Sequence, residues 1–274
     1  MSGARDDEAP EAYYLPGPDG TFTATIATES PWDTRAQHGG PPCALIGHVI
    51  RENHPEPGFR IARLTVEFLG TIPRSDVQVT TEVVRDGRRI RLIEATMTSG
   101  GKKVALARAW QIATGPDGLL EGAEFKGAKE VEVPALPDPQ PQGGFGRPGW
   151  GYGESVEGRR IRGAYRGTGY AQVWMRPLIP LVAGEKMHPL DRVLVVADSA
   201  NGVSARLEMS EWLYVPPAVT VTLHRYPEDE WVLISARSDL ASDGVGSTTG
   251  TLSDSSGSIG SVTQPLLIAP APRA

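Results

Sequence analysis

The chain has 274 residues, of which 39% are apolar, and a net charge of −6, so it is long enough for one or two domains with buried cores. The negative charge argues against nucleic acid as a partner, because that binding depends on Lys and Arg at phosphates. The single cysteine, Cys43, excludes an internal disulfide and a cysteine-rich metal site. The sequence begins without a secretory signal and has no apolar run of about 20 residues to span a membrane, so we expect a cytoplasmic protein.

The first half of the chain reads as one helix followed by strands. Residues 39–53 have the apolar spacing of a helix, and residues 63–68 alternate apolar and polar side chains as a half-buried strand does. Three further strand-like runs follow, separated by Asp86-Gly87 and by Ser99-Gly100-Gly101. Both separators predict hairpin turns, because glycine accepts the positive φ that such turns use.

The second half repeats this order. Residues 189–200 have helical spacing and end at Asn201-Gly202, a pair that suits a helix C-terminus. Residues 219–223 alternate as the earlier strand does, and the later runs are separated by Asp243-Gly244 and Ser256-Gly257.

The spacing of glycine and glutamine also repeats. Gly87 and Gly100 are 13 residues apart, as are Gly244 and Gly257. The last strand of each half carries one glutamine, Gln111 in the first and Gln264 in the second.

Between the halves the composition shifts to proline and glycine, which excludes a continuous helix or a central strand. We therefore predict an N-terminal module over 12–115, a connection over 116–165 and a C-terminal module over 166–270. One helix followed by antiparallel strands, twice, predicts an α+β fold in which each of two sheets wraps a central helix. The two modules would pack together as an internal pseudo-dimer.

Three motifs carry a family resemblance: His38-Gly39-Gly40 at the first helix, Ala197 to Gly202 late in the second, and Val262-Thr263-Gln264 in the last strand. In this order they resemble the tandem hotdog acyl-CoA thioesterases, over nearly the whole chain except the connection and the extreme N-terminus. The resemblance implies a double hotdog fold and a thioester hydrolase of lipid metabolism.

The resemblance also implies a mechanism without a covalent serine. An aspartate, a glutamine and a hydroxyl residue would hold the attacking water. The aspartate corresponds here to Asp198 and the glutamine to Gln264, and Thr220 is the candidate for the hydroxyl. Backbone N–H groups at a helix N-terminus would polarise the thioester carbonyl. That contact falls to His38, Gly39 and Gly40, with Thr222 as a further substrate contact.

At the hydroxyl position this sequence departs from the family. The related enzymes place a threonine eight residues, and an acidic residue six residues, before the histidine of the strand. Counting back from His224 gives Pro216 and Ala218, which can do neither task. Thr220 or Thr222, on the same strand face by period-two counting, would substitute, or the site is weakened.

Each candidate residue also has a simpler interpretation. Asp198 near a helix C-terminus could be a solvated charge, which the helix dipole would disfavour. Gln264 could face solvent, His38-Gly39-Gly40 could only begin a helix, and Cys43 could fill the core. Residues 144–149 match Gly-x-Gly-x-x-Gly, but no apolar strand precedes them.

Three functions remain open at this point. The first is an acyl-CoA thioesterase acting on an acyl-CoA or acyl-carrier thioester, with no cofactor and no metal, since the five histidines lack ligand spacing. The second is a non-catalytic hotdog module that binds acyl thioesters or protein partners, which Pro216 and Ala218 favour. The third, a hotdog hydratase, lacks the Asp-x-Asn-x-x-His pattern. A homo-oligomer is compatible with all three.

Overall fold

The computed structural model describes residues 10–55, 57–116, 118–123, 127–140, 149–163 and 169–271. The strands of the first half are β1 (Tyr14–Pro16), β2 (Thr21–Ala24), β3 (Phe59–Phe68), β4 (Asp76–Asp86), β5 (Ile90–Ser99) and β6 (Lys102–Ala113). Those of the second half are β7 (Val156–Arg162), β8 (Tyr170–Pro177), β9 (Trp212–Val215), β10 (Ala218–Leu223), β11 (Val232–Leu240), β12 (Val245–Asp254) and β13 (Gly257–Pro270).

The helices are α1 (Gly40–Asn53), α2 (Gly151–Glu154), α3 (Pro189–Ala197) and α4 (Ala200–Val203). They are accompanied by the short 3-10 turns η1 (Pro18–Gly20), η2 (Ile26–Thr28) and η3 (Ala128–Glu130). In the described part of the chain, no helix is long and apolar enough to cross a membrane.

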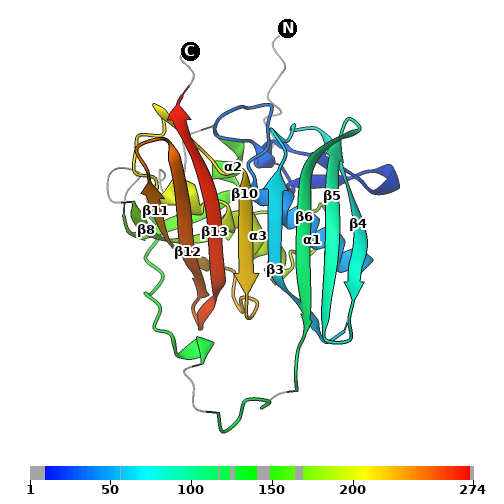
Figure 1. The fold of residues 1–274 in the computed structure, drawn as a ribbon. Coiled ribbons are helices and arrows are strands. Elements are labelled where there is room, and N and C mark those ends of the chain that lie inside the picture. Colours follow the sequence, from blue (N-terminus) through cyan, green and yellow to red (C-terminus); the bar gives the residue numbers. More distant parts are fainter. Residues whose placement is uncertain are drawn as a thin grey trace.

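The strands form one continuous antiparallel sheet in the order β1-β2-β4-β5-β6-β3-β10-β13-β12-β11-β8-β7, and β9 pairs with β13 (Figure 1). The two predicted sheets therefore meet edge to edge. Their joint is the pairing of β3 with β10, in which Thr65 lies opposite Thr220. This pairing satisfies the backbone groups of two edges that would otherwise be open.

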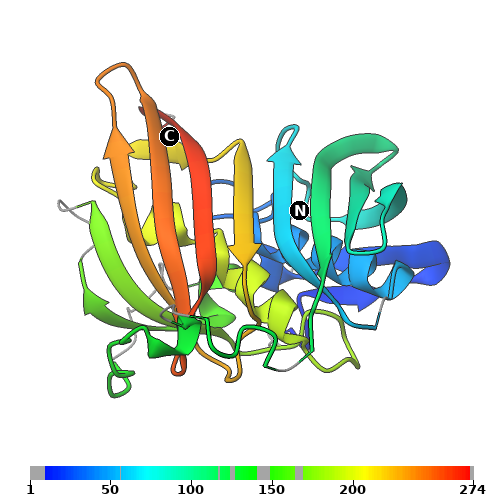
Figure 2. The ribbon, with the colours of Figure 1, turned by 60° about the horizontal axis from the view of Figure 1, so that its bottom comes forward.

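The two long helices lie next to each other on the same side of the sheet (Figure 2). α1 packs on β4, β5 and β6, and α3 packs on β8 and β11. Leu45, Ile46 and Ile50 of α1 are fully buried there, as are Val193 and Val195 of α3. Full burial of one such side chain stabilises the fold by roughly 1.5–3 kcal/mol. Because α1 and α3 also pack on each other, the helices hold the two halves together as well as filling the core.

The first helix was predicted correctly, and the second only in part. α1 spans nearly all of the predicted residues 39–53. α3 ends at Ala197, the helix is interrupted at Asp198 and Ser199, and α4 then includes Asn201 and Gly202. The prediction that one helix ends at Asn201-Gly202 is therefore wrong, and the break falls at a candidate site residue.

The predicted turns connect neighbouring strands in both halves. Gly100, Gly244 and Gly257 have positive φ, as expected of these turns. Gly87 does not, and it is required for a different reason: a Cβ there would lie 2.5 Å from the carbonyl oxygen of Ile90.

The predicted connection contains regular structure. Its residues 149–163 include α2 and β7, and β7 pairs with β8 at the end of the sheet, where a strand needs only one partner. The glycine-rich match at 144–149 lies outside the described residues except for Gly149. The N-terminal segment also reaches the second half, because the N–H groups of Tyr13 and Tyr14 donate to the carbonyls of Pro180 and Leu181.

We expect residues 1–115, expressed alone, to self-associate. Without the second half, the β10-facing edge of β3 and the α3-facing side of α1 are exposed. Size-exclusion chromatography with light scattering, with the full chain as the reference, checks this. A monomeric fragment that unfolds cooperatively would contradict the internal pseudo-dimer.

Candidate functional site

The site lies where the N-terminus of α1 meets the C-terminal end of α3. The backbones approach so closely that a Cβ on Gly40 would lie 2.0 Å from the Val195 carbonyl oxygen. A Cβ on Gly39 would lie 2.7 Å from Oδ2 of Asp198. Both glycines predicted for substrate contact are therefore needed to bring the two helices together.

His38 precedes α1 and is held from both sides. Its Nδ1 accepts the N–H of Gly40 at 3.1 Å, and its ring stacks on Tyr152 with centroids 3.9 Å apart. Burial lowers the pKa of His38 to about 3, so the imidazole is neutral at physiological pH. Because Nδ1 accepts a hydrogen bond, the ring proton is on Nε2, which makes His38 a neutral N–H donor.

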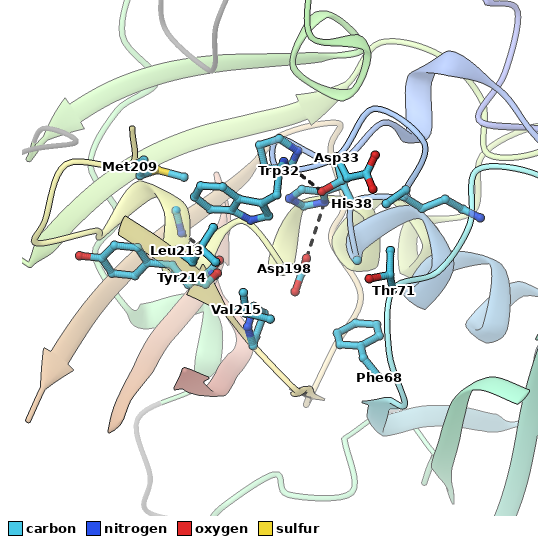
Figure 3. Close-up of a pocket in the computed structure, with 18 of the residues that line it drawn as sticks. Trp32, Asp33, His38, Phe68, Thr71, Asp198, Met209, Leu213, Tyr214 and Val215 are labelled. Atoms are coloured by element: carbon cyan, nitrogen blue, oxygen red, sulfur yellow. Dashed lines mark hydrogen bonds and ion pairs between the residues drawn. The ribbon is translucent and has the colours of Figure 1, made fainter. Parts of the chain in front are cut away.

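Asp198 caps α3 and is 5% exposed. Its carboxylate accepts hydrogen bonds from the backbone N–H of Gly39 and from Nε2 of Gln264, the latter at 2.9 Å. Burial raises the pKa of Asp198 to about 6, and these two hydrogen bonds oppose the rise only in part. Its Oδ2 lies 3.6 Å from Nδ1 of His38 (Figure 3). The residue is therefore a carboxylate at neutral pH with a proton affinity near that pH, as a general base requires.

Gln264 lies behind Asp198. Its Oε1 accepts the N–H of Asn201 at 3.1 Å, and its Nε2 donates to the backbone carbonyl of Asp198 at 3.1 Å as well as to the carboxylate. Both hydrogens of the amide group therefore have protein acceptors. The structure places Gln264 beside Asp198, where its amide group fixes the carboxylate across the helix break.

The structure does not bring Thr220 or Thr222 to Asp198. Val219 and Val221 are buried on the helix side of β10, so the alternating threonines point to the other face of the sheet. Thr220 Oγ1 instead lies 3.0 Å from Oγ1 of Thr65, and Thr222 is exposed. The prediction that Thr220 or Thr222 replaces the family threonine is therefore wrong, because both hydroxyls lie on the face of the sheet away from Asp198.

Two aromatic residues of the predicted connection belong to the site. Trp150 lines the pocket and donates from Nε1 to the carbonyl oxygen of Glu29 at 2.7 Å. The hydroxyl of Tyr152 lies 2.9 Å from both the Val195 carbonyl oxygen and Ser199 Oγ, while its ring supports His38. Sequence reasoning missed both residues. The available signal was a pair of large aromatic residues in a stretch otherwise rich in glycine and proline.

Asp198 faces a cavity of about 890 Å³. Figure 3 shows Trp32, Met209 and Leu213 on one side of Asp198, and Phe68 and Thr71 on the other. Apart from Asp198 and His38, the walls near the carboxylate are largely apolar, which suits an extended apolar ligand with one polar centre. In the described ranges, no group of His, Cys, Asp and Glu side chains could hold a metal ion.

Two family models match separate parts of the chain. A model of the acyl-CoA thioesterase N-terminal domain matches residues 28–112, and one of the acyl-CoA thioesterase C-terminal domain matches residues 130–268. No curated protein sequence matches the chain.

Solved structures show the same fold at low identity. An acyl-CoA thioesterase II from Mycobacterium marinum is 17% identical, with a TM-score of 0.64 over 89% of this chain and 96% of that one. The tesB protein of Mycobacterium avium subspecies paratuberculosis is 15% identical, with a TM-score of 0.64 over 91% and 93%. A hot dog protein of unknown function from Alicyclobacillus acidocaldarius is 19% identical, with a TM-score of 0.69 over 96% and 98%. The predicted double hotdog fold is confirmed.

We expect Gly40→Ala to destabilise the protein by about 3 kcal/mol or more, because the added methyl group meets a backbone carbonyl that cannot rotate away. Urea unfolding of the full chain measures the loss. Gly70→Ala is the matched control, since a Cβ there has open space, and it should change stability by under about 1 kcal/mol. Equal stability of the two variants would show that the helices do not cross this closely.

Proposed function

The chain belongs to the acyl-CoA thioesterase family and is a thioester hydrolase, and from this premise we propose that it cleaves acyl-CoA with Asp198 as the general base. The observation that supports this role best is the buried Asp198 carboxylate, with its raised pKa, in the wall of an apolar cavity. The acyl chain would lie on the side of Trp32, Met209 and Leu213, whose apolar side chains line the cavity wall next to Glu208 and Ser210.

In the proposed reaction Asp198 removes a proton from water as the water oxygen attacks the thioester carbonyl carbon. The tetrahedral intermediate then collapses, the carbon–sulfur bond breaks, and the thiolate leaves with its electron pair. Protonated Asp198 returns the proton to the thiolate. The products are the carboxylic acid and the free thiol, and the base is restored.

His38 is the proposed donor to the carbonyl oxygen. The sequence placed this task on helix N-terminal N–H groups, but Gly39 N–H already donates to Asp198 and Gly40 N–H to His38. His38 lines the cavity and carries its proton on Nε2, so it can donate to the oxygen as negative charge develops there. Its low pKa keeps it neutral, and it therefore does not protonate the base beside it.

A non-catalytic module remained open from the sequence because Pro216 and Ala218 stand where the family has functional side chains. Pro216 lines the cavity and offers no side-chain donor. The base and the carbonyl donor proposed here do not depend on those positions, so we favour hydrolysis. A thiol-release assay with short, medium, long and aromatic acyl-CoAs separates the two functions, because a binding module releases no thiol.

We expect Asp198→Asn to lower kcat by about 100- to 10,000-fold with little change in KM, because the carboxylate acts in the transition state. Gln264→Ala should cause a smaller loss, and the double variant should be little worse than Asp198→Asn, since both residues serve one base. Thiol release measures turnover, and thermal unfolding confirms that each variant is folded. A folded Asp198→Asn protein with near wild-type kcat would refute the assignment.

The pH profile tests the same base independently. Only ionised Asp198 accepts a proton, so kcat/KM should rise with pH and level off above about 6. His38, with a pKa of about 3, should add no second limb in the neutral range. Steady-state rates with one acyl-CoA across this range measure the profile, and a midpoint near 4 would contradict a buried base.

The free energy of unfolding should fall as pH rises, whereas kcat/KM rises. The pKa of Asp198 is higher in the folded chain than its ordinary value of 3.8, so its ionisation destabilises the fold as pH rises from 3.8 to about 6. A shift of this size corresponds to about 3 kcal/mol at most. Asp198→Asn should therefore gain stability relative to the wild type as pH rises through this window, as unfolding in urea at each pH would show.

A further inference from the structure

The cavity provides no cation for a phosphorylated substrate. Its lining residues are all in the described part of the chain and include Asp33, Asp198 and Glu208 but no Lys or Arg. The whole chain is also negative, at −6. A thiol carrier that bears phosphate groups would therefore be repelled unless positive side chains stand beside the cavity.

Two arginines stand beside it, on paired loops that carry lining residues. Ala36 pairs with Pro73, and the N–H of Arg74 donates to the carbonyl oxygen of Arg35 at 2.7 Å. Asp33 and Ala36 line the cavity from the first loop, and Thr71 and Ile72 line it from the second. Figure 3 shows Asp33 and Thr71 on the side of Asp198 away from Met209 and Leu213. The arginines are thus at the end opposite the proposed acyl side.

Each guanidinium group donates hydrogen bonds to the protein from some of its nitrogens and has other nitrogens left for a ligand. Asp33 holds Arg35 through Nε and Nη2, each at 3.1 Å, while the Arg35 side chain is 88% exposed. Arg74 donates from Nε to the carbonyl oxygen of Thr34 at 2.9 Å. Within the described residues, Nη1 of Arg35 and both terminal nitrogens of Arg74 have no protein acceptor. Two guanidinium groups and one carboxylate leave a net positive charge, and their planar donors match phosphate oxygens.

The Met209 side of the cavity is lined by Glu208, Met209, Ser210 and Leu213, with no Lys or Arg among these described residues. The phosphates would therefore lie toward Arg35 and Arg74, and the acyl chain toward Met209.

We propose that Arg35 and Arg74 form a binding site for the phosphate groups of the thiol carrier. This inference rests on the proposed thioesterase function, and it deepens that function by naming where the carrier leaves the cavity. Coenzyme A and the phosphopantetheine arm of a carrier protein share the required chemistry.

The test compares two substrates with the same acyl group, one on coenzyme A and one on N-acetylcysteamine, which has no phosphate. In the full chain, Arg35→Gln/Arg74→Gln should raise KM for the acyl-CoA roughly fivefold to twentyfold, as expected for two exposed charge contacts. KM for the N-acetylcysteamine thioester should not change. The difference should shrink at high salt, because exposed charges are screened. Arg88→Gln, an exposed arginine in the β4–β5 turn, is the matched charge control.

Direct binding of free coenzyme A by calorimetry gives a readout that does not need turnover. Loss of affinity in the double variant but not in Arg88→Gln supports the site, whether or not a tested thioester is hydrolysed. Equal affinity, or an equal rise of KM for both substrates, overturns it. Absence of hydrolysis by the wild type would count against the proposed function alone. Faster turnover of an acyl carrier protein than of acyl-CoA, lost in the double variant, would support the site and assign the phosphate to the carrier protein.

Discussion

The close contact between the start of α1 and the end of α3 is the constraint on which the site depends. It requires glycine at position 40, opposite the Val195 carbonyl, and it places His38 beside Asp198 although they are far apart in the sequence. The contact also resolves an electrostatic difficulty. Asp198 is at the unfavourable negative end of its own helix, but it lies at the positive end of α1 and accepts the Gly39 N–H.

The other end of the same helix pair repeats the geometry without repeating the site. Nδ1 of His188 accepts the N–H of Leu190 at 3.1 Å, just as His38 accepts that of Gly40. Asp198 follows His188 by ten residues, and the residue ten after His38 is His48. There Arg51 forms an ion pair with the buried Asp191 at 2.8 Å. The internal repeat therefore duplicates the fold, whereas the proposed base and its glycine contact occur at one end.

How much the sequence could predict depended on whether a feature is local. Helical spacing and the His38-Gly39-Gly40 motif predicted α1 and its entry, because period and backbone freedom are local properties. Period-two counting correctly placed Thr220 on one face with Ala218, but it could not be extended through Pro216, where the strand is interrupted before β10 begins. Tyr152 could not be placed at all, because its role depends on packing against a helix distant in the sequence.

The break between α3 and α4 explains why the base needs a partner on the sheet. A break frees backbone groups that are costly to bury without hydrogen bonds. Gln264 satisfies the Asn201 N–H and the Asp198 carbonyl with one side chain, and the same amide group holds the carboxylate. Gln264 is opposite Thr248 in the pairing of β13 with β12, so a slip of one residue would turn it to the outer face. The position of the proposed base is therefore set by the register of the last strand as much as by the helix that carries it.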